Sequence, residues 1–120
     1  MANYIPTKRE ESLLPGGRPK YVRCYDNGGE TLDRYTVVFT GRYRHKTGGE
    51  FWHLGMNSQP FHGIGQHGQS DTQIDYPAYA HLGRKIAFGD LPEDCRRLVL
   101  QTYCYLWDIR DPATGEVPDD

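Results

Sequence analysis

The sequence predicts an α+β fold: a small antiparallel sheet of three to five strands packed by one long C-terminal helix, with a long ordered central loop. Three observations lead to this prediction. Residues 21–56 alternate apolar and polar side chains with the period of two that is typical of strands. Glycine-rich turn sequences at residues 26–29 and 46–49 interrupt this pattern. Apolar residues between positions 91 and 106 recur at helical spacing.

Length and composition indicate one domain. The chain has 120 residues, of which 25% are charged and 37% hydrophobic, and this is enough for a single core. We expect a flexible N-terminal arm over residues 1–20, a single α+β domain over residues 21–110 and a loose acidic tail over residues 111–120. The arm is rich in proline and glycine. Its one apolar pair, Leu13 and Leu14, offers the alternative that the arm docks on the domain.

Strands are expected at residues 21–26, 34–40, 50–56 and 84–88. The second of them is rich in β-branched and aromatic residues, and its alternation places Tyr35, Val37 and Phe39 on one face. The Asn27-Gly28 pair is a strong signal for the turn between the first two strands, because both residue types accept a positive φ.

The C-terminal helix is expected to open at Asp90, whose carboxylate suits a helix N-cap, with Glu93 at the third helical position. Its apolar stripe is Leu91, Cys95, Leu98, Val99, Thr102 and Leu106. Residues 103–107 are apolar around more of the circumference, so we expect them to pack against the arm or a second chain. An oligomer formed through this helix is therefore one alternative.

Cysteine usage and charge exclude several classes of protein. Cys24, Cys95 and Cys104 are odd in number and form no CxxC pair, which argues against a disulfide framework or a thiolate zinc site and favours buried free thiols. The net charge is −2, and residues 1–53 carry nine Lys/Arg against six Asp/Glu, whereas residues 71–120 carry five against ten. This balance lacks the overall basic footprint of a dedicated nucleic-acid-binding domain.

The location is inferred from two absences. No apolar run approaches the roughly 20 residues of a membrane span, and the N-terminal residues lack the pattern of an export signal. We therefore expect a cytoplasmic protein with no membrane partner.

The stretch from residue 60 to residue 69 holds the densest set of side chains suited to chemistry. Glycines let backbone N–H groups approach an anion closely, and glutamine and histidine side chains can recognise a base or a ribose. Together with the turn after the first strand, this stretch forms the predicted ligand-binding site, whose residues are His62, Gly63, Gly65, Gln66, His67, Gln69, Arg34, Asp26 and Asn27. It is neither a Walker motif nor a dinucleotide fingerprint. The alternative to ligand binding is that these glycines serve only the geometry of the loop.

Three other functions compete with phosphate recognition. His62, His67 and His81 are weak metal candidates for zinc, but the spacing of the first two matches no ligand motif, so no cofactor is expected. His62 or His67 could act as a general base in a hydrolase or transferase, although no catalytic residue can be assigned. A tyrosine-rich sheet face could bind a host protein or stack nucleic-acid bases; its residues would be Tyr21, Tyr25, Tyr35, Tyr43 and Phe51.

Several short motifs occur along the chain: YDNGG at residues 25–29, DRYTVVF at 33–39, PFH at 60–62, GQH at 65–67, and LGRKI at 82–86 with DLPED at 90–94. Together they resemble small uncharacterised proteins of bacteriophages and prophages. The resemblance covers about residues 21–100 and implies a mobile-element origin in an infected bacterium. It brings no known activity and assigns no catalytic residue.

These observations favour a non-catalytic binding protein of mobile-element type. The expected ligand is a nucleotide, a nucleic-acid end or another phosphate-bearing molecule. A histidine- or metal-dependent enzyme and a protein-interaction module that inhibits a host factor are the alternatives.

Overall fold

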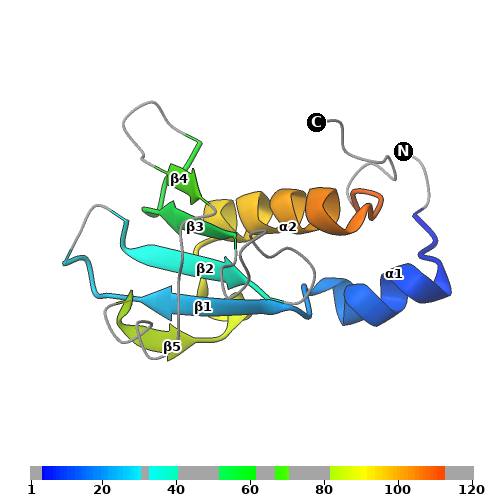
Figure 1. The fold of residues 1–120 in the computed structure, drawn as a ribbon, viewed down its shortest axis with the longest axis horizontal. Helices are drawn as coiled ribbons and strands as arrows, with labels where there is room; N and C mark the ends of the chain where they lie inside the picture. The colour runs from blue at the N-terminus through cyan, green and yellow to red at the C-terminus, as the bar shows by residue number, and fades with distance from the viewer. Residues whose placement is uncertain (1–3, 31–32, 41–51, 62–66, 71–81, 113–120) are drawn as a thin grey trace, which may run out of the picture.

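The computed structural model describes residues 4–30, 33–40, 52–61, 67–70 and 82–112 (Figure 1). These residues form an antiparallel sheet with the order β4-β3-β2-β1-β5 and a helix, α2, along one face of it. The strands are β1 (Val22–Asp26), β2 (Tyr35–Phe39), β3 (His53–Met56), β4 (His67–Ser70) and β5 (Arg84–Ile86). The helices are α1 (Lys8–Leu13) and α2 (Glu93–Trp107), with 3₁₀ turns at Pro15–Gly17 and Phe88–Asp90. The predicted α+β fold class is confirmed.

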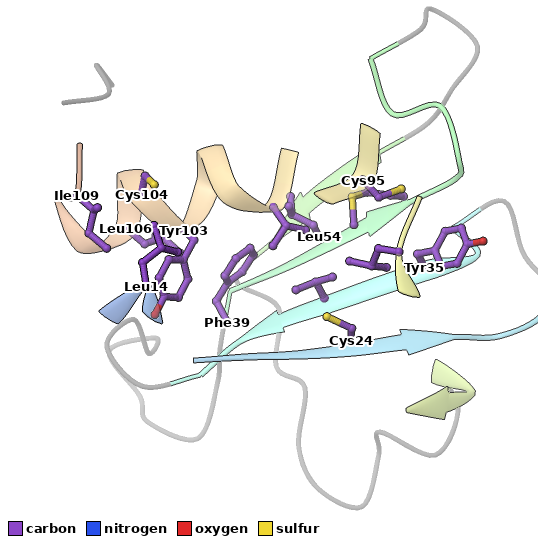
Figure 2. Packing of buried hydrophobic residues seen from close by; sticks show 14 of the residues in the cluster. Leu14, Cys24, Tyr35, Phe39, Leu54, Cys95, Tyr103, Cys104, Leu106 and Ile109 are labelled. Carbon is purple, nitrogen blue, oxygen red and sulfur yellow. The ribbon is translucent and has the colours of Figure 1, made fainter. Parts of the chain in front are cut away.

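The core lies between α2 and the face of the sheet that carries Cys24, Val37 and Leu54. The strand register places these three residues side by side on β1, β2 and β3, and all three are buried. Figure 2 shows Cys24 and Leu54 on the side of the sheet that faces the helix. Tyr35 and Phe39 lie in the same cluster, so the predicted alternation of the second strand is confirmed. Every residue of β2 is buried, because β2 is central in the sheet and covered on both faces.

The predicted helical stripe also matches the structure. Five of its six residues are buried, and the sixth, Leu98, is partly buried and packs against the core. The predicted start of the helix is wrong, since α2 begins at Glu93 with Pro92 at the N-cap. The Asp90 carboxylate instead accepts a hydrogen bond from the Ala87 N–H at 3.0 Å and closes the preceding 3₁₀ turn. The helix ends at Trp107, and its C-cap residue, Asp108, has φ 52° in the left-handed region.

Residues 4–20 differ from the flexible arm that the sequence favours. Residues 8–13 form α1, which opens with a capping box in which Thr7 and Glu10 each bond the backbone N–H of the other. Leu13 and Leu14 at the end of α1 are buried in the main core. Figure 2 shows Leu14 beside Tyr103, Leu106 and Ile109 at the C-terminal end of α2. The N-terminal segment is therefore docked on the domain, which is the alternative given above, because Leu13 and Leu14 complete the core.

The hydroxyl group of Tyr103 fastens the N-terminal segment to α2. It donates to the Leu13 carbonyl at 2.6 Å and accepts from the backbone N–H groups of Lys20 and Tyr21 at 3.2 and 3.3 Å. The ring of Tyr21 also stacks on Trp107, with 5.3 Å between the ring centroids. The apolar end of α2 therefore packs against the N-terminal segment, as one of the two sequence-based alternatives proposes.

We predict that Tyr103→Phe loosens this segment. The substitution removes the hydroxyl and withdraws a hydrogen-bond partner from three backbone groups, so it is expected to lower the free energy of unfolding by about 1–3 kcal/mol. Chemical denaturation measures the loss, and limited proteolysis is expected to cleave residues 8–20 faster. Tyr105→Phe changes an exposed tyrosine of the same helix and serves as the control. Equal stability of the two variants would contradict the assigned role.

An ion pair connects α1 to the chain that follows α2. The buried Glu10 carboxylate accepts from the Arg110 side chain, with 2.7 Å between Arg110 Nη2 and Glu10 Oε1, and from the Arg110 backbone N–H at 3.1 Å. These hydrogen bonds hold the pKa of Glu10 well below its usual range. A carboxyl group with a lower pKa in the folded state stabilises the fold above its unfolded pKa. That stabilisation is lost as the pH falls toward the folded value.

Glu10→Gln is accordingly expected to destabilise the protein by about 2 kcal/mol at pH 7, since it weakens charged hydrogen bonds in a buried position. The difference from the unmodified protein is expected to shrink as the pH falls below about 4.3, the usual pKa of a glutamate. Unfolding curves between pH 7 and pH 2 test both statements. Glu11→Gln, at the exposed neighbouring position, is the control and should show neither effect.

The three cysteines are free and buried, as the sequence predicts. Burial raises the pKa of the Cys24 and Cys104 thiols to about 12 and that of Cys95 to about 11. The thiols are therefore protonated and poorly reactive at neutral pH. Cys95 donates a hydrogen bond from its Sγ to the Asn57 carbonyl at 3.1 Å, which ties the segment after β3 to α2. In the described ranges, no helix combines the length and apolar character that a membrane crossing requires.

Candidate functional site

The strand register places Asp26 and His67, one residue from each part of the predicted site, at the same end of the sheet. One row of paired residues crosses all five strands, and its members are His67, Met56, Tyr35, Asp26 and Arg84. β1 ends and β2 and β5 begin near this row, and the segment from β3 to β4 also leaves the sheet here. Neighbouring strands lie about 4.8 Å apart, so the backbones of Asp26 and His67 are separated by roughly 14 Å.

The best-defined part of this end is a carboxylate with two arginines. Asp26 Oδ1 accepts from Arg34 Nε at 2.9 Å, and Asp26 Oδ2 accepts from Arg34 Nη2 at 3.2 Å. Arg84 Nη2 lies 4.0 Å from the same Oδ2 atom. The Asp26 side chain is only 10% exposed, whereas the side chains of Arg34 and Arg84 are 46% and 78% exposed. We call this group the Asp26 cluster; it carries one negative and two positive charges.

The electrostatics of the cluster follow from these contacts. The hydrogen bonds from Arg34 lower the pKa of Asp26, and the Gly28 N–H, which donates to Oδ1 at 2.8 Å, acts in the same direction. Asp26 is therefore ionised at neutral pH. The Arg34 guanidinium is held in two ways, by the two-point bond to Asp26 and by its position over the Tyr35 ring at 5.1 Å from the centroid. Its orientation is thus fixed by contacts within the protein.

Asn27 organises the turn that carries the cluster. Its Oδ1 accepts from the Gly29 and Glu30 N–H groups at 2.9 and 3.1 Å. Its Nδ2 donates to the Asp33 carbonyl at 3.1 Å. The backbone N–H of Asn27 also donates to the Arg34 carbonyl at 3.0 Å. These bonds fasten the two ends of the turn, so Asn27 acts by positioning Asp26 and Arg34.

Gly83 completes the site at the start of β5. It has φ +96°, and a Cβ atom built there would lie 2.4 Å from the Asp26 carbonyl oxygen and 2.5 Å from the Asn27 Cα. Only glycine allows so close an approach of two backbones with this φ value. The sequence patterns predict no role for Gly83. The local signal that could have indicated one is a glycine directly before the short strand that begins at Arg84.

Gly83→Ala is expected to lower the free energy of unfolding by about 2 kcal/mol or more, because the methyl group collides with backbone atoms and the φ value becomes strained. Gly89→Ala is a matched control six residues away, where the nearest atom to a new Cβ is 3.9 Å distant. Thermal unfolding of both variants provides the measurement. A Gly83→Ala protein as stable as the control would rule out the close approach described here.

The remaining predicted site residues are only partly described. His62, Gly63, Gly65 and Gln66 lie outside the described residues, as does His81. His67 and Gln69 belong to β4, which pairs with β3 at the edge of the sheet. The prediction of one continuous loop is therefore wrong at this point, because β3 supplies hydrogen-bond partners for residues 67–70.

After β3, the chain contacts α2 again at Phe61. Pro60 is fully buried, and the Arg97 guanidinium lies over the exposed Phe61 ring at 4.3 Å from its centroid. Within the part of the chain that the structure describes, no three His, Cys, Asp or Glu residues gather closely enough to hold a metal ion. The weak metal candidates His62 and His81 fall outside that part, so their role as ligands stays a prediction.

The proposed tyrosine-rich face is wrong for the residues that the structure describes. Tyr25 pairs with Thr36, and Tyr35 pairs with Asp26, so the two tyrosines lie on opposite faces of the sheet. Both are buried, and Tyr21 stacks on Trp107. Tyr43 and Phe51 lie outside the described residues. The cause is that both sheet faces are covered at these positions, which leaves no open aromatic surface there.

Comparison with known proteins adds no assignment, since no family model, curated protein or solved structure matches this chain.

Proposed function

We propose that this protein is a non-catalytic binding protein that recognises a phosphate-bearing ligand, a nucleotide or a nucleic-acid end, at the Asp26 cluster. The observation that carries the proposal is the fixed and exposed Arg34 guanidinium, supported by Asp26 and accompanied by Arg84. Arginine is the side chain best suited to phosphate because its planar fork donates several parallel hydrogen bonds.

The geometry leaves the cluster able to accept an anion. Arg34 uses Nε and Nη2 for Asp26, and its half-exposed side chain presents the rest of the guanidinium to solvent. Arg84 is more exposed and lies at the distance limit of an ion pair, so it can turn toward a ligand at low cost. The two arginines outweigh the single carboxylate by one positive charge, which favours an anionic group.

The position of the cluster also supports the proposal. The first residue of β4, His67, lies in the same row across the sheet as Asp26. The mobile-element origin and the cytoplasmic location remain predictions from the sequence.

The test is a titration with inorganic phosphate, AMP and ATP by isothermal calorimetry. We expect ATP to bind, and Arg84→Gln to weaken the binding about tenfold, as one lost charge-assisted contact would. Arg34→Gln is expected to weaken it further. Lys8→Gln removes an exposed charge from α1 and should leave the affinity unchanged.

Folding must be separated from binding in this experiment. Arg84 is mostly exposed, so its variant should unfold at the same temperature as the unmodified protein, which makes its loss of affinity interpretable. The proposal fails if none of the three anions binds at millimolar concentration. It also fails if the double variant Arg34→Gln/Arg84→Gln binds ATP as tightly as the Lys8→Gln control.

A further inference from the structure

We infer that the Asp26 cluster binds a terminal phosphoryl group, with three non-bridging oxygens and two negative charges, and that Arg34 and Arg84 contact this one group together. The inference rests on the proposed function and specifies which phosphate the cluster recognises. Nucleotides and nucleic-acid ends that carry a phosphate monoester are then ligands, whereas cyclic nucleotides and internal phosphodiester groups bind weakly.

The two guanidinium groups approach the same atom of the cluster. Arg34 Nη2 lies 3.2 Å and Arg84 Nη2 lies 4.0 Å from Asp26 Oδ2, so the two nitrogens cannot be further apart than the sum of these distances. A charge-assisted hydrogen bond to a phosphoryl oxygen is about 2.8 Å long. One phosphoryl group between the arginines can therefore accept from both, whereas two separate anions so close together would repel each other.

Each arginine has a pair of parallel donors available for this group. Arg34 uses Nε and Nη2 for Asp26, which leaves the edge formed by its two terminal nitrogens. Arg84 lies at the distance limit of an ion pair, and its side chain is 78% exposed, so its guanidinium fork can turn toward a ligand. Each fork binds two oxygens. A terminal phosphoryl group serves both forks with three oxygens, one of them shared, but a phosphodiester has only two.

Backbone groups of the neighbouring turn are already engaged. The N–H of Gly28 donates to the Asp26 carboxylate, and those of Gly29 and Glu30 donate to the Asn27 side chain. An anion at the cluster therefore depends on guanidinium groups rather than on these backbone donors. Replacement of either arginine is expected to change the affinity directly.

Stabilisation of Asp26 explains Arg34 but not Arg84. The carboxylate accepts from Arg34 and from the Gly28 N–H, and an exposed cation at 4.0 Å adds little to a carboxylate that is already bonded. Arg84 also keeps the edge strand β5 from pairing with other chains, but the exposed Lys85 serves that purpose as well. The surplus positive charge at Arg84 is what attracts a second anion.

Isothermal calorimetry at pH 7.5 compares three ligands that differ in one group. AMP has three non-bridging oxygens and two charges, adenosine 5′-sulfate has three oxygens and one charge, and 3′,5′-cyclic AMP has two oxygens and one charge. AMP is expected to bind at least about tenfold tighter than cyclic AMP, with the sulfate between them. Equal affinities for AMP and cyclic AMP would overturn the inference while the proposed function stands. If AMP, ATP and inorganic phosphate all fail to bind, both fail.

The pH dependence tests the second charge. The last proton of a phosphate monoester dissociates near pH 6, so the affinity for AMP is expected to fall about tenfold from pH 7.5 to pH 5. Adenosine 5′-sulfate has no such proton, and its affinity is expected to stay constant. An affinity for AMP that is equally constant would contradict recognition of the doubly charged group.

Groups of the protein near the cluster do not mimic this effect. The hydrogen bonds from Arg34 lower the pKa of Asp26, so its charge persists at pH 5. His67, in the same row of the sheet, could only gain a proton as the pH falls, which would strengthen the binding of an anion. Any other charged group of the neighbouring segments would act on AMP and the sulfate alike; these groups are Glu30, Asp33, Lys85 and Asp90.

Three variants test the joint contact. Arg84→Gln is expected to weaken AMP binding about tenfold and to bring the affinities for AMP and cyclic AMP within about threefold of each other. Arg84→Lys keeps the charge without the fork and is expected to lose the same preference. Lys85→Gln removes a charge from the next position, on the opposite face of β5, and should leave AMP binding within twofold. A preference for AMP that survives in Arg84→Gln would overturn the two-arginine contact.

A nucleic-acid end carries the same group as a free nucleotide. A strand of four thymidine nucleotides with a 5′-phosphate is expected to bind at least about tenfold tighter than the same strand with a 5′-hydroxyl, whose phosphates are all diesters. Tighter binding of the phosphorylated strand than of AMP would assign the group to a nucleic-acid end, and the reverse order would assign it to a free nucleotide. Equal binding of the two strands would overturn the inference.

Discussion

The buried hydroxyl of Tyr103 is the interaction on which the arrangement of this fold depends. Residues 14–21 contain two prolines and two glycines, so most of their backbone groups lack partners from a regular helix or strand. Near the C-terminal end of α2, the Tyr103 hydroxyl accepts from the Lys20 and Tyr21 N–H groups of this segment and donates to the carbonyl of Leu13, just before it. Because the segment leads directly into β1, the same hydroxyl fixes where the sheet begins relative to the helix. Leu14 then fills the space beside Leu106 and Ile109 (Figure 2).

The sheet and the main helix could be predicted because their signals are local. The alternation that places Val37 and Phe39 on one face is set by chain geometry alone, and burial against α2 reinforces it. The turn at Asn27 could be predicted for the same reason, since an Asn-Gly pair favours that backbone wherever it occurs. These elements therefore appear in the structure within one to three residues of their predicted bounds, wherever the structure describes them.

The elements that could not be predicted from the sequence depend on residues that are distant along the chain. α1 is short, and its buried acid Glu10 is compensated by Arg110, one hundred residues later; only the Thr7–Glu10 capping pattern signalled it locally. β4 has little strand propensity of its own and forms against β3. Gly83 and Arg84 join the site because β5 pairs with β1, a strand from much earlier in the chain. No local pattern specifies that pairing.

One register serves both the core and the candidate site. The row of residues that buries Met56 and Tyr35 continues to Asp26 and Arg84, where the core gives way to solvent. A carboxylate that is only slightly exposed needs donors, and Arg34 and the Gly28 N–H provide them. Arg34 is consequently an exposed cation whose orientation is set by the packing behind it. A slip of one residue between β1 and β2 would move Asp26 to the other face and separate it from the arginine. The electrostatics of this surface are therefore determined by the same constraint that specifies the fold.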